Sequence, residues 1–295
     1  MQQQIKSVEK YRFNTFSDND TAESVEITGF LMSRILFDKN GNITETKTFD
    51  SDEEVEEHIQ YIYNDAGLKT EEILFDQDEI AERHEFIYDD NKLILKELIY
   101  YQDDVYDTLN YDYDEEKRIV KRTLVDSDND IESVTTYIYK SGKLIQESKY
   151  IDENELVAEL KYEFNEKGLL IKTEFFDLET EEKNSTEYEY DEAGNKLKEL
   201  VYNNVGELIL RNTYTYNDKN KKTTLLEEGI GKYNCYTFEY DEEGNAVKQI
   251  ETDEEGEEVS AIVNNYKDGN IVEAQSFGRE YHHNVMHKYE YEFYE

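Results

Sequence analysis

Asp126, Asp128 and Asp130 alternate with other residues and form the best candidate for a cation site in this chain. Carboxylate oxygens are the ligands that a hard cation such as Ca²⁺ takes. In the calcium loop that this spacing resembles, a glycine follows the third acid and a glutamate closes the loop, but here Ile131 and Tyr137 stand at those positions. We therefore expect a solvated acidic turn without a metal, and these three aspartates are the candidate contacts for a binding partner.

Three of the five histidines lie close together near the end of the chain, at positions 282, 283 and 287. Histidine binds zinc, but adjacent residues of a strand point to opposite faces, so His282 and His283 cannot act on one ion. Only His283 and His287 share a face, and the single cysteine, Cys235, is two sequence repeats away. A structural or surface role is the favoured interpretation, and no metal site is predicted.

Catalytic motifs are weak throughout the sequence. The chain contains 72 Asp and Glu residues, so a pair at glycosidase spacing would arise by chance. Gly229-Ile230-Gly231-Lys232 lacks the full glycine spacing of a phosphate-binding loop, and no nucleophile-elbow pattern occurs. These observations predict a protein that is not an enzyme and that uses no cofactor.

The charge of the chain constrains its partners. The 72 acidic residues face 32 Lys and Arg residues, giving a formal net charge of −40. Such a charge repels nucleic-acid phosphates and anionic membrane surfaces, so we expect a basic protein partner and no nucleic acid. Neither a signal-peptide core nor a membrane span is found in the sequence, which favours the cytoplasm; export after removal of a signal is the alternative.

The elements that must position these residues follow one repeated figure, represented by residues 188–195, where two tyrosines one residue apart precede an acidic turn containing glycine. A fixed period of about 25 residues indicates a repeat array. The second aromatic of each figure serves as its marker. The markers are Phe13, Phe37, Tyr63, Tyr88, Tyr113, Tyr139, Phe164, Tyr190, Tyr216, Tyr240, Tyr266 and Tyr291.

Apolar and polar residues alternate before each marker, which is typical of a half-buried strand. A turn follows the marker, then a second strand, then a second turn rich in acids. Gly142 and Gly269 come one position early and predict shorter turns, whereas Lys92, Lys117 and Asn220 replace the usual glycine. We therefore predict an all-β fold of tandem β-hairpin repeats of about 25 residues.

Some 22 strands of this kind should form one long curved or spiralling antiparallel sheet, because open sheets of more than about 10 strands seldom stay flat. The tyrosine and leucine face should be buried, and the glutamate, lysine and threonine face should be exposed. Residues 1–30 are expected to form an irregular N-terminal cap, and residues 31–295 a single elongated repeat domain.

The figure Tyr-x-Tyr-Asp-x-x-Gly-Asn at residues 188–195, and its equivalent at residues 238–245, resembles the YD repeats of bacterial Rhs proteins and related toxin shells. The resemblance covers about residues 30–291 and implies hairpins that coil into a β-shell. This chain is much shorter than the large shells, its period is longer, and it has no recognisable enclosed toxin domain. The resemblance therefore implies a free-standing binding module.

The function predicted from these features is that of a non-enzymatic acidic binding protein, and more specifically an immunity-type inhibitor that binds a basic toxin or effector domain. The alternative is an exported or cell-surface repeat module that binds carbohydrate or another surface protein. Exposed tyrosines would serve the alternative, since aromatic rings stack on flat ligands.

Overall fold

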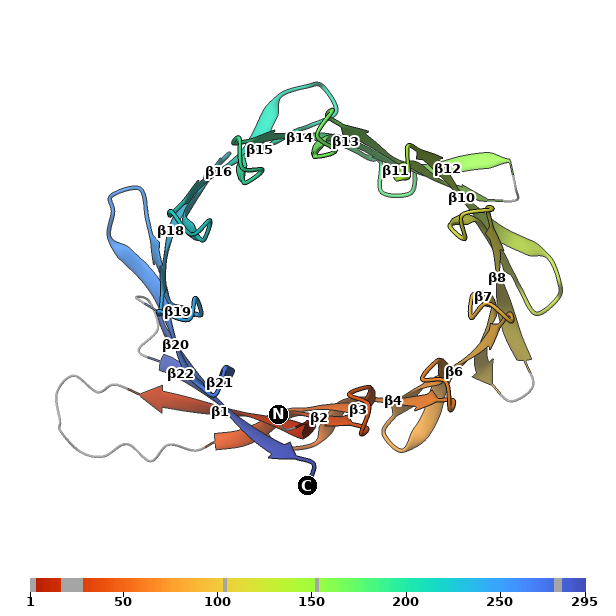
Figure 1. The fold of residues 1–295 in the computed structure, drawn as a ribbon, viewed down its shortest axis with the longest axis horizontal. Helices are drawn as coiled ribbons and strands as arrows, with labels where there is room; N and C mark the ends of the chain where they lie inside the picture. Colours follow the sequence, from red (N-terminus) through yellow and green to blue (C-terminus); the bar gives the residue numbers. More distant parts are fainter. Residues whose placement is uncertain (1–3, 17–28, 103–104, 152–153, 279–282) are drawn as a thin grey trace. The chain divides into compact units, whose positions relative to one another are not determined.

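The computed structural model describes residues 4–16, 29–102, 105–151, 154–278 and 283–295. Every regular element in these ranges is a β-strand, and 22 strands belong to one antiparallel sheet (Figure 1). The strands are β1 (Ile5–Phe16), β2 (Gly29–Phe37), β3 (Ile43–Phe49), β4 (Val55–Tyr63), β5 (Lys69–Asp76), β6 (Glu79–Tyr88), β7 (Ile94–Gln102), β8 (Val105–Tyr113), β9 (Ile119–Val125), β10 (Ile131–Lys140), β11 (Lys143–Ile151), β12 (Glu155–Phe164), β13 (Leu170–Asp177), β14 (Glu182–Tyr190), β15 (Lys196–Tyr202), β16 (Leu208–Tyr216), β17 (Lys222–Gly229), β18 (Lys232–Tyr240), β19 (Ala246–Thr252), β20 (Glu258–Lys267), β21 (Asn270–Gly278) and β22 (His283–Phe293). The all-β fold and the hairpin repeat are confirmed.

The turn that follows each marker explains the repeated figure. After Tyr190, the amide of Gly194 donates to the carbonyl of Asp191 at 3.2 Å, and Gly194 has a φ of +90°. The Asp191 carboxylate accepts from both the backbone and the side-chain amide of Asn195, each at 2.8 Å. These hydrogen bonds, led by the one from the Asn195 side chain, lower the pKa of Asp191. Each polar residue of the figure thus has a fixed role in closing the hairpin.

Departures from the figure change the turns as the sequence predicts. Tyr139 pairs with Leu144, whereas Tyr190 pairs with Lys196, so the turn containing Gly142 is one residue shorter. Lys117 adopts the left-handed φ of +64° that glycine adopts elsewhere. A lysine is strained in that conformation, because its Cβ approaches the following carbonyl oxygen.

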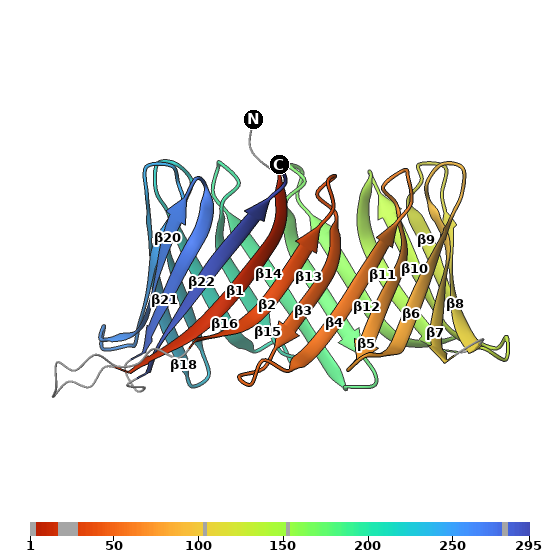
Figure 2. The ribbon, with the colours of Figure 1, turned by 90° about the horizontal axis from the view of Figure 1, so that it is seen from below.

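The first strand of the chain pairs with the last, which differs from the predicted long curved or spiralling sheet. Strand β1 pairs with β2 on one side and with β22 on the other, so the sheet closes on itself (Figure 2). The β1–β22 ladder runs from the pair Ile5–Phe293 to the pair Phe16–His283. Unpaired edge strands expose a row of backbone donors and acceptors, and this pairing satisfies them.

The domain boundary predicted at residue 30 falls beside residues 17–28, which lie outside the described residues. Within the predicted irregular cap, residues 5–16 form the regular strand β1. The chain divides into two compact units, which we describe separately. The first unit contains residues 1–81, 215–226 and 233–295, and the second contains residues 82–214 and 227–232.

The sheet has very little apolar core. Among the described residues, only three hydrophobic residues are buried: Ile73 and Ala261 in the first unit and Val134 in the second. The marker Tyr190 is half-buried and its neighbour Glu189 is exposed, so the alternation holds, but the tyrosine positions are not a buried core. We call the face that bears Tyr188 and Tyr190 the tyrosine face, together with the residues that share it by strand register.

Candidate partner-binding surface

The three candidate aspartates lie together in the turn between β9 and β10, and they have two different roles. One carboxylate oxygen of Asp126 accepts from the amide of Asp128 at 2.9 Å and from that of Asp130 at 2.8 Å. Asp126 is half-buried and holds the turn closed, whereas Asp128 and Asp130 are exposed. Neither of these two carboxylates forms an ion pair with any described residue. Asp128 and Asp130 are therefore available to a partner, and Asp126 positions them.

This turn belongs to a row of second turns in the second unit. Consecutive strands alternate in direction, so the β9–β10, β13–β14 and β15–β16 turns all lie at one end of the sheet in this unit. We call this end, made of residues 126–130, 178–181 and 203–207, the second-turn edge. Neighbouring strands lie about 4.8 Å apart, so turns that are one hairpin apart are separated by about 10 Å.

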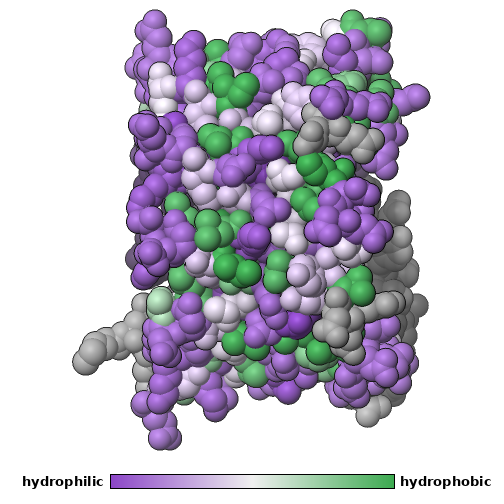
Figure 3. Space-filling view, turned by 90° about the vertical axis from the view of Figure 1, so that its right-hand side faces the viewer, coloured by the Kyte–Doolittle hydropathy of each residue, from purple (hydrophilic) through white to green (hydrophobic). Residues whose placement is uncertain are grey.

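The second-turn edge combines unpaired acids with exposed apolar side chains. Glu179 and Glu181 are exposed, like Asp128 and Asp130, and form no ion pair within the described part of the chain. Beside them, Leu178 is 47% exposed and Val205 is 73% exposed. Figure 3 shows one face of the molecule, on which hydrophobic side chains form small patches between hydrophilic ones. Carboxylates next to exposed apolar groups are suited to a protein partner that carries both cations and apolar residues.

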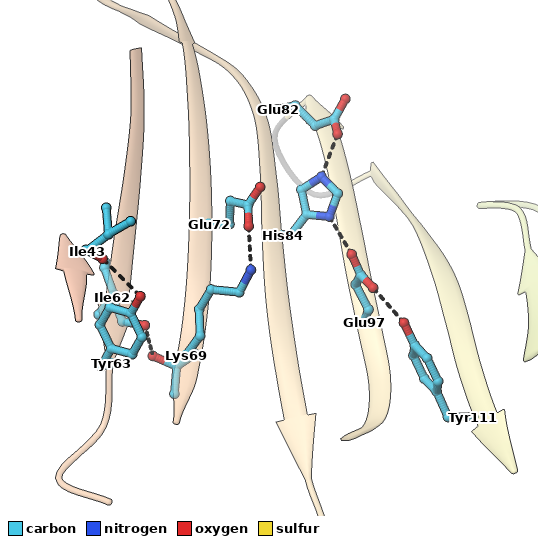
Figure 4. Close-up of polar contacts among 10 residues, drawn as sticks. Ile43, Ile62, Tyr63, Lys69, Glu72, Glu82, His84, Glu97 and Tyr111 are labelled. Carbon is cyan, nitrogen blue, oxygen red and sulfur yellow. Dashed lines mark hydrogen bonds and ion pairs between the residues drawn. The ribbon is translucent and has the colours of Figure 1, made fainter. Parts of the chain in front are cut away.

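The marker tyrosines use their hydroxyl groups to connect successive hairpins, which the sequence analysis did not anticipate. In the second unit, the hydroxyl of Tyr190 donates to the carbonyl of Leu170 at 2.7 Å, and that of Tyr139 donates to Ile119 at 2.9 Å. In the first unit, Tyr63 donates in the same way to Ile43 at 2.9 Å (Figure 4). The available signal was the preference for tyrosine over phenylalanine at the marker, because only tyrosine has a donor.

A line of polar side chains crosses strands β6 to β8 on the tyrosine face of the second unit. His84 lies between Glu82, at 2.5 Å from its Nε2, and Glu97, at 2.6 Å from its Nδ1 (Figure 4). The other oxygen of Glu97 accepts from the hydroxyl of Tyr111 at 2.9 Å. The contact with Glu97 is the main cause of the raised pKa of His84, and burial raises the pKa of Tyr111. Two carboxylates therefore favour a protonated imidazole.

The remaining candidates are not assembled into a site. His282 lies outside the described residues, and His287 is half-buried, which lowers its pKa. No cluster of three metal-ligating side chains occurs in the described ranges. Residues 229–232 form the hairpin turn between β17 and β18, with Ile230 87% exposed, and not a phosphate-binding loop before a helix. The described residues include no helix able to span a membrane.

No protein-family model and no curated protein matches this chain. Among solved structures, it is similar to a chain of the Photorhabdus luminescens Tc holotoxin pore carrying the mutation TccC3-D651A, with 12% identity and a TM-score of 0.41 over 91% of this chain and 16% of that chain. It is also similar to a porin-like protein from Bacteroides uniformis, with 13% identity and a TM-score of 0.34 over 98% and 96% of the two chains. A third similar structure is TcdB2-TccC3 without its hypervariable C-terminal region, with 11% identity and a TM-score of 0.28 over 86% and 19%.

This chain thus spans about a sixth of the length of the toxin chain in the Tc pore. Components of a toxin complex are among the solved structures that it resembles. With identities of 13% or less and TM-scores below 0.5, the likeness says nothing about function.

Proposed function

We propose that this protein is a non-enzymatic binding protein that holds a basic protein partner at the second-turn edge. The observation that supports this most directly is the set of exposed, unpaired carboxylates of Asp128, Asp130, Glu179 and Glu181 beside the exposed side chain of Leu178. The two turns that carry these acids are four strands apart, or about 19 Å, which is more than twice the Debye length of about 8 Å at physiological salt. Each turn therefore attracts a cation separately, and a partner with two basic groups at this spacing engages both.

The more specific form of the proposal is an immunity-type inhibitor that binds a basic toxin or effector domain in the cytoplasm. It rests on the sequence resemblance to YD repeats of toxin systems and on the charge of −40. Complementary charge raises the association rate and selects against acidic competitors. The exposed apolar residues of the same edge would then slow dissociation, because they lose water contact only in the complex.

The test compares two charge-matched variants in association kinetics with a partner captured from native lysate. One variant carries D128N, D130N, E179Q and E181Q at the second-turn edge. The other removes four exposed and unpaired acids from first turns at the opposite end of the same unit, through D90N, E115Q, E166Q and E192Q. Asp126 is kept in both, so that the β9–β10 turn stays closed.

We expect the first variant to associate at least about tenfold more slowly than the wild type and the second to change little, with the difference shrinking as salt is added. Equal slowing in both variants would mean that only the total charge matters. An acidic partner, or a carbohydrate that binds wild type and both variants alike, would contradict the proposal and favour the carbohydrate-binding alternative.

A further inference from the structure

A shallow hollow of about 410 Å³ lies on the tyrosine face of the second unit, next to the second-turn edge. Its apolar lining comes from strands β7 to β13. By strand register, Leu109 pairs with Leu124, and Ile99 extends this apolar surface. Leu160 and its partner Phe175 lie on the other side of β10 and β11. The volume falls within the range of about 300 to 1,000 Å³ that is typical of small-molecule sites.

Two cations border this apolar surface, and neither is well paired. The Nε of Arg122 is buried without an acceptor, and the Glu147 carboxylate oxygen is 3.9 Å from its Nη2. The guanidinium carbon also lies 5.4 Å from the centre of the Tyr137 ring. Lys149 is exposed and forms no ion pair within the described part of the chain. The other acid in the lining, Glu159, is bonded to Lys161 at 2.5 Å. The lining therefore holds two cations and one carboxylate, Glu147, that has no close cation, and Asp177 beside the hollow is near enough to Lys149 for their charges to interact.

Arg122 also differs from the residues at the equivalent position of the neighbouring repeats. This position pairs with the first aromatic residue of each repeated figure. In the neighbouring hairpins an acid occupies this position. Glu97 pairs with Phe86 and Glu147 pairs with Tyr137, whereas Arg122 pairs with Tyr111. Lysines elsewhere on the sheet approach a glutamate closely, as in the 2.5 Å contact of Lys196 with Glu199. A cation that replaces an acid, lacks a close counter-ion and borders an apolar hollow is suited to an anionic group on an otherwise apolar ligand.

We propose that this hollow binds an amphipathic monocarboxylate. Its hydrocarbon part lies on Leu124, Leu109 and Ile99, which follow one another across β9, β8 and β7, and its carboxylate lies at Arg122, on the side of that residue that faces Lys149. The guanidinium group offers a planar pair of donors that matches a carboxylate. Distant negative charges of the protein are screened beyond about 8 Å at physiological salt, so the charge at the site is set by Arg122 and Lys149 against Glu147. The inference does not depend on the proposed partner.

The test uses decanoate and its uncharged analogue decanol as probes, with affinity measured by titration calorimetry on the full chain. Wild type should bind one decanoate saturably and decanol at least about tenfold more weakly, a difference of about 1.4 kcal/mol. The substitution R122Q should weaken decanoate by at least about tenfold and leave decanol unchanged. The substitution L109A should weaken both probes, because it removes part of the apolar floor.

Lys140 supplies the matched control, since it is an exposed cation of the same unit that does not line the hollow. The substitution K140Q should leave both affinities unchanged. If R122Q disturbs folding in circular dichroism, K149Q at the exposed rim provides the second charge deletion and should weaken decanoate alone. Absence of saturable decanoate binding, equal binding of decanol, or equal losses in R122Q and K140Q would overturn the proposal.

Discussion

Removing the hydroxyl group of Tyr190 tests whether the marker tyrosines stabilise the repeat by hydrogen bonding between hairpins. In Tyr190→Phe the ring stays, and only the 2.7 Å hydrogen bond to the carbonyl of Leu170 is lost. Both residues are half-buried, so water can reach the carbonyl after the change. The cost should therefore be the net value of one hydrogen bond, about 1 kcal/mol, and not the larger penalty of a buried group without a partner.

Tyr190→Ala removes the ring as well. Truncation of a fully buried aromatic costs about 3 to 5 kcal/mol, and half burial reduces this to about 2 kcal/mol for the tyrosine. At an unfolding entropy of about 2.1 cal/mol/K per residue, a loss of 1 kcal/mol lowers the Tm by about 2 °C if the whole chain unfolds together. Glu189→Ala is the control: its side chain is 51% exposed, and its ion pair with Lys198 is worth less than about 0.5 kcal/mol.

Thermal unfolding followed by circular dichroism measures the Tm, and hydrogen exchange of peptides from β13 and β14 shows where protection is lost. The expected order of destabilisation is Tyr190→Ala, then Tyr190→Phe, then Glu189→Ala. A Tyr190→Phe variant as stable as the wild type would refute the role of the hydroxyl. A Tyr190→Phe variant as unstable as Tyr190→Ala would show that the ring contributes nothing.

Three further predictions concern other features of the second unit. Phe164 is a marker without a hydroxyl, and Phe164→Tyr should raise stability by up to about 1 kcal/mol in chemical denaturation if the new hydroxyl reaches a carbonyl of the preceding hairpin. Gly194→Ala should lower the free energy of unfolding by about 1 kcal/mol, because residue 194 has a φ of +90°. Lys117→Gly should be neutral or slightly stabilising, because the lysine already has a φ of +64°. The Tm values of the two variants test both predictions. The pKa of His84 is raised in the folded protein, so protonation of its imidazole favours folding. Wild type should therefore have a higher Tm than His84→Gln. The difference should be full below about pH 6.5 and should decline as the pH rises through the folded-state pKa.

The local structure of the repeat was predictable from the sequence because it depends on neighbouring residues alone. Asp191 and Asn195 close their turn with their own side chains, and Gly194 supplies the positive φ, so residue type dictates geometry. The turn at Asp126 follows the same rule. Asp126, Asp128 and Asp130 were expected to be equivalent. The residue type at the start of the turn already separates them, because the Asp126 carboxylate accepts both amides and the other two acids are exposed.

Burial was harder to predict, because alternation shows which residues share a face and not what covers that face. Tyr190 and Val134 both alternate with polar neighbours, yet Tyr190 is half-buried and Val134 is buried. The contacts of Arg122 were equally hidden. Its partners depend on the pairing of β9 with β8 and β10, which brings together residues that are far apart in the repeat.

The sheet can close only because it has an even number of strands, although an even number does not by itself make a sheet close. In a meander of antiparallel strands, odd and even strands run in opposite directions, so the first and last strands can pair antiparallel only when the number of strands is even. The count of 22 satisfies this condition, and β1 pairs with β22 through eleven residue pairs, compared with eight between β10 and β11. A long ladder compensates the entropy of joining the two ends of the chain.

Because the two strands that would otherwise be edges are paired with each other, a partner cannot add a strand to either without breaking this ladder. Recognition is thereby directed to the turns and faces, where the unpaired carboxylates and the Arg122 hollow lie.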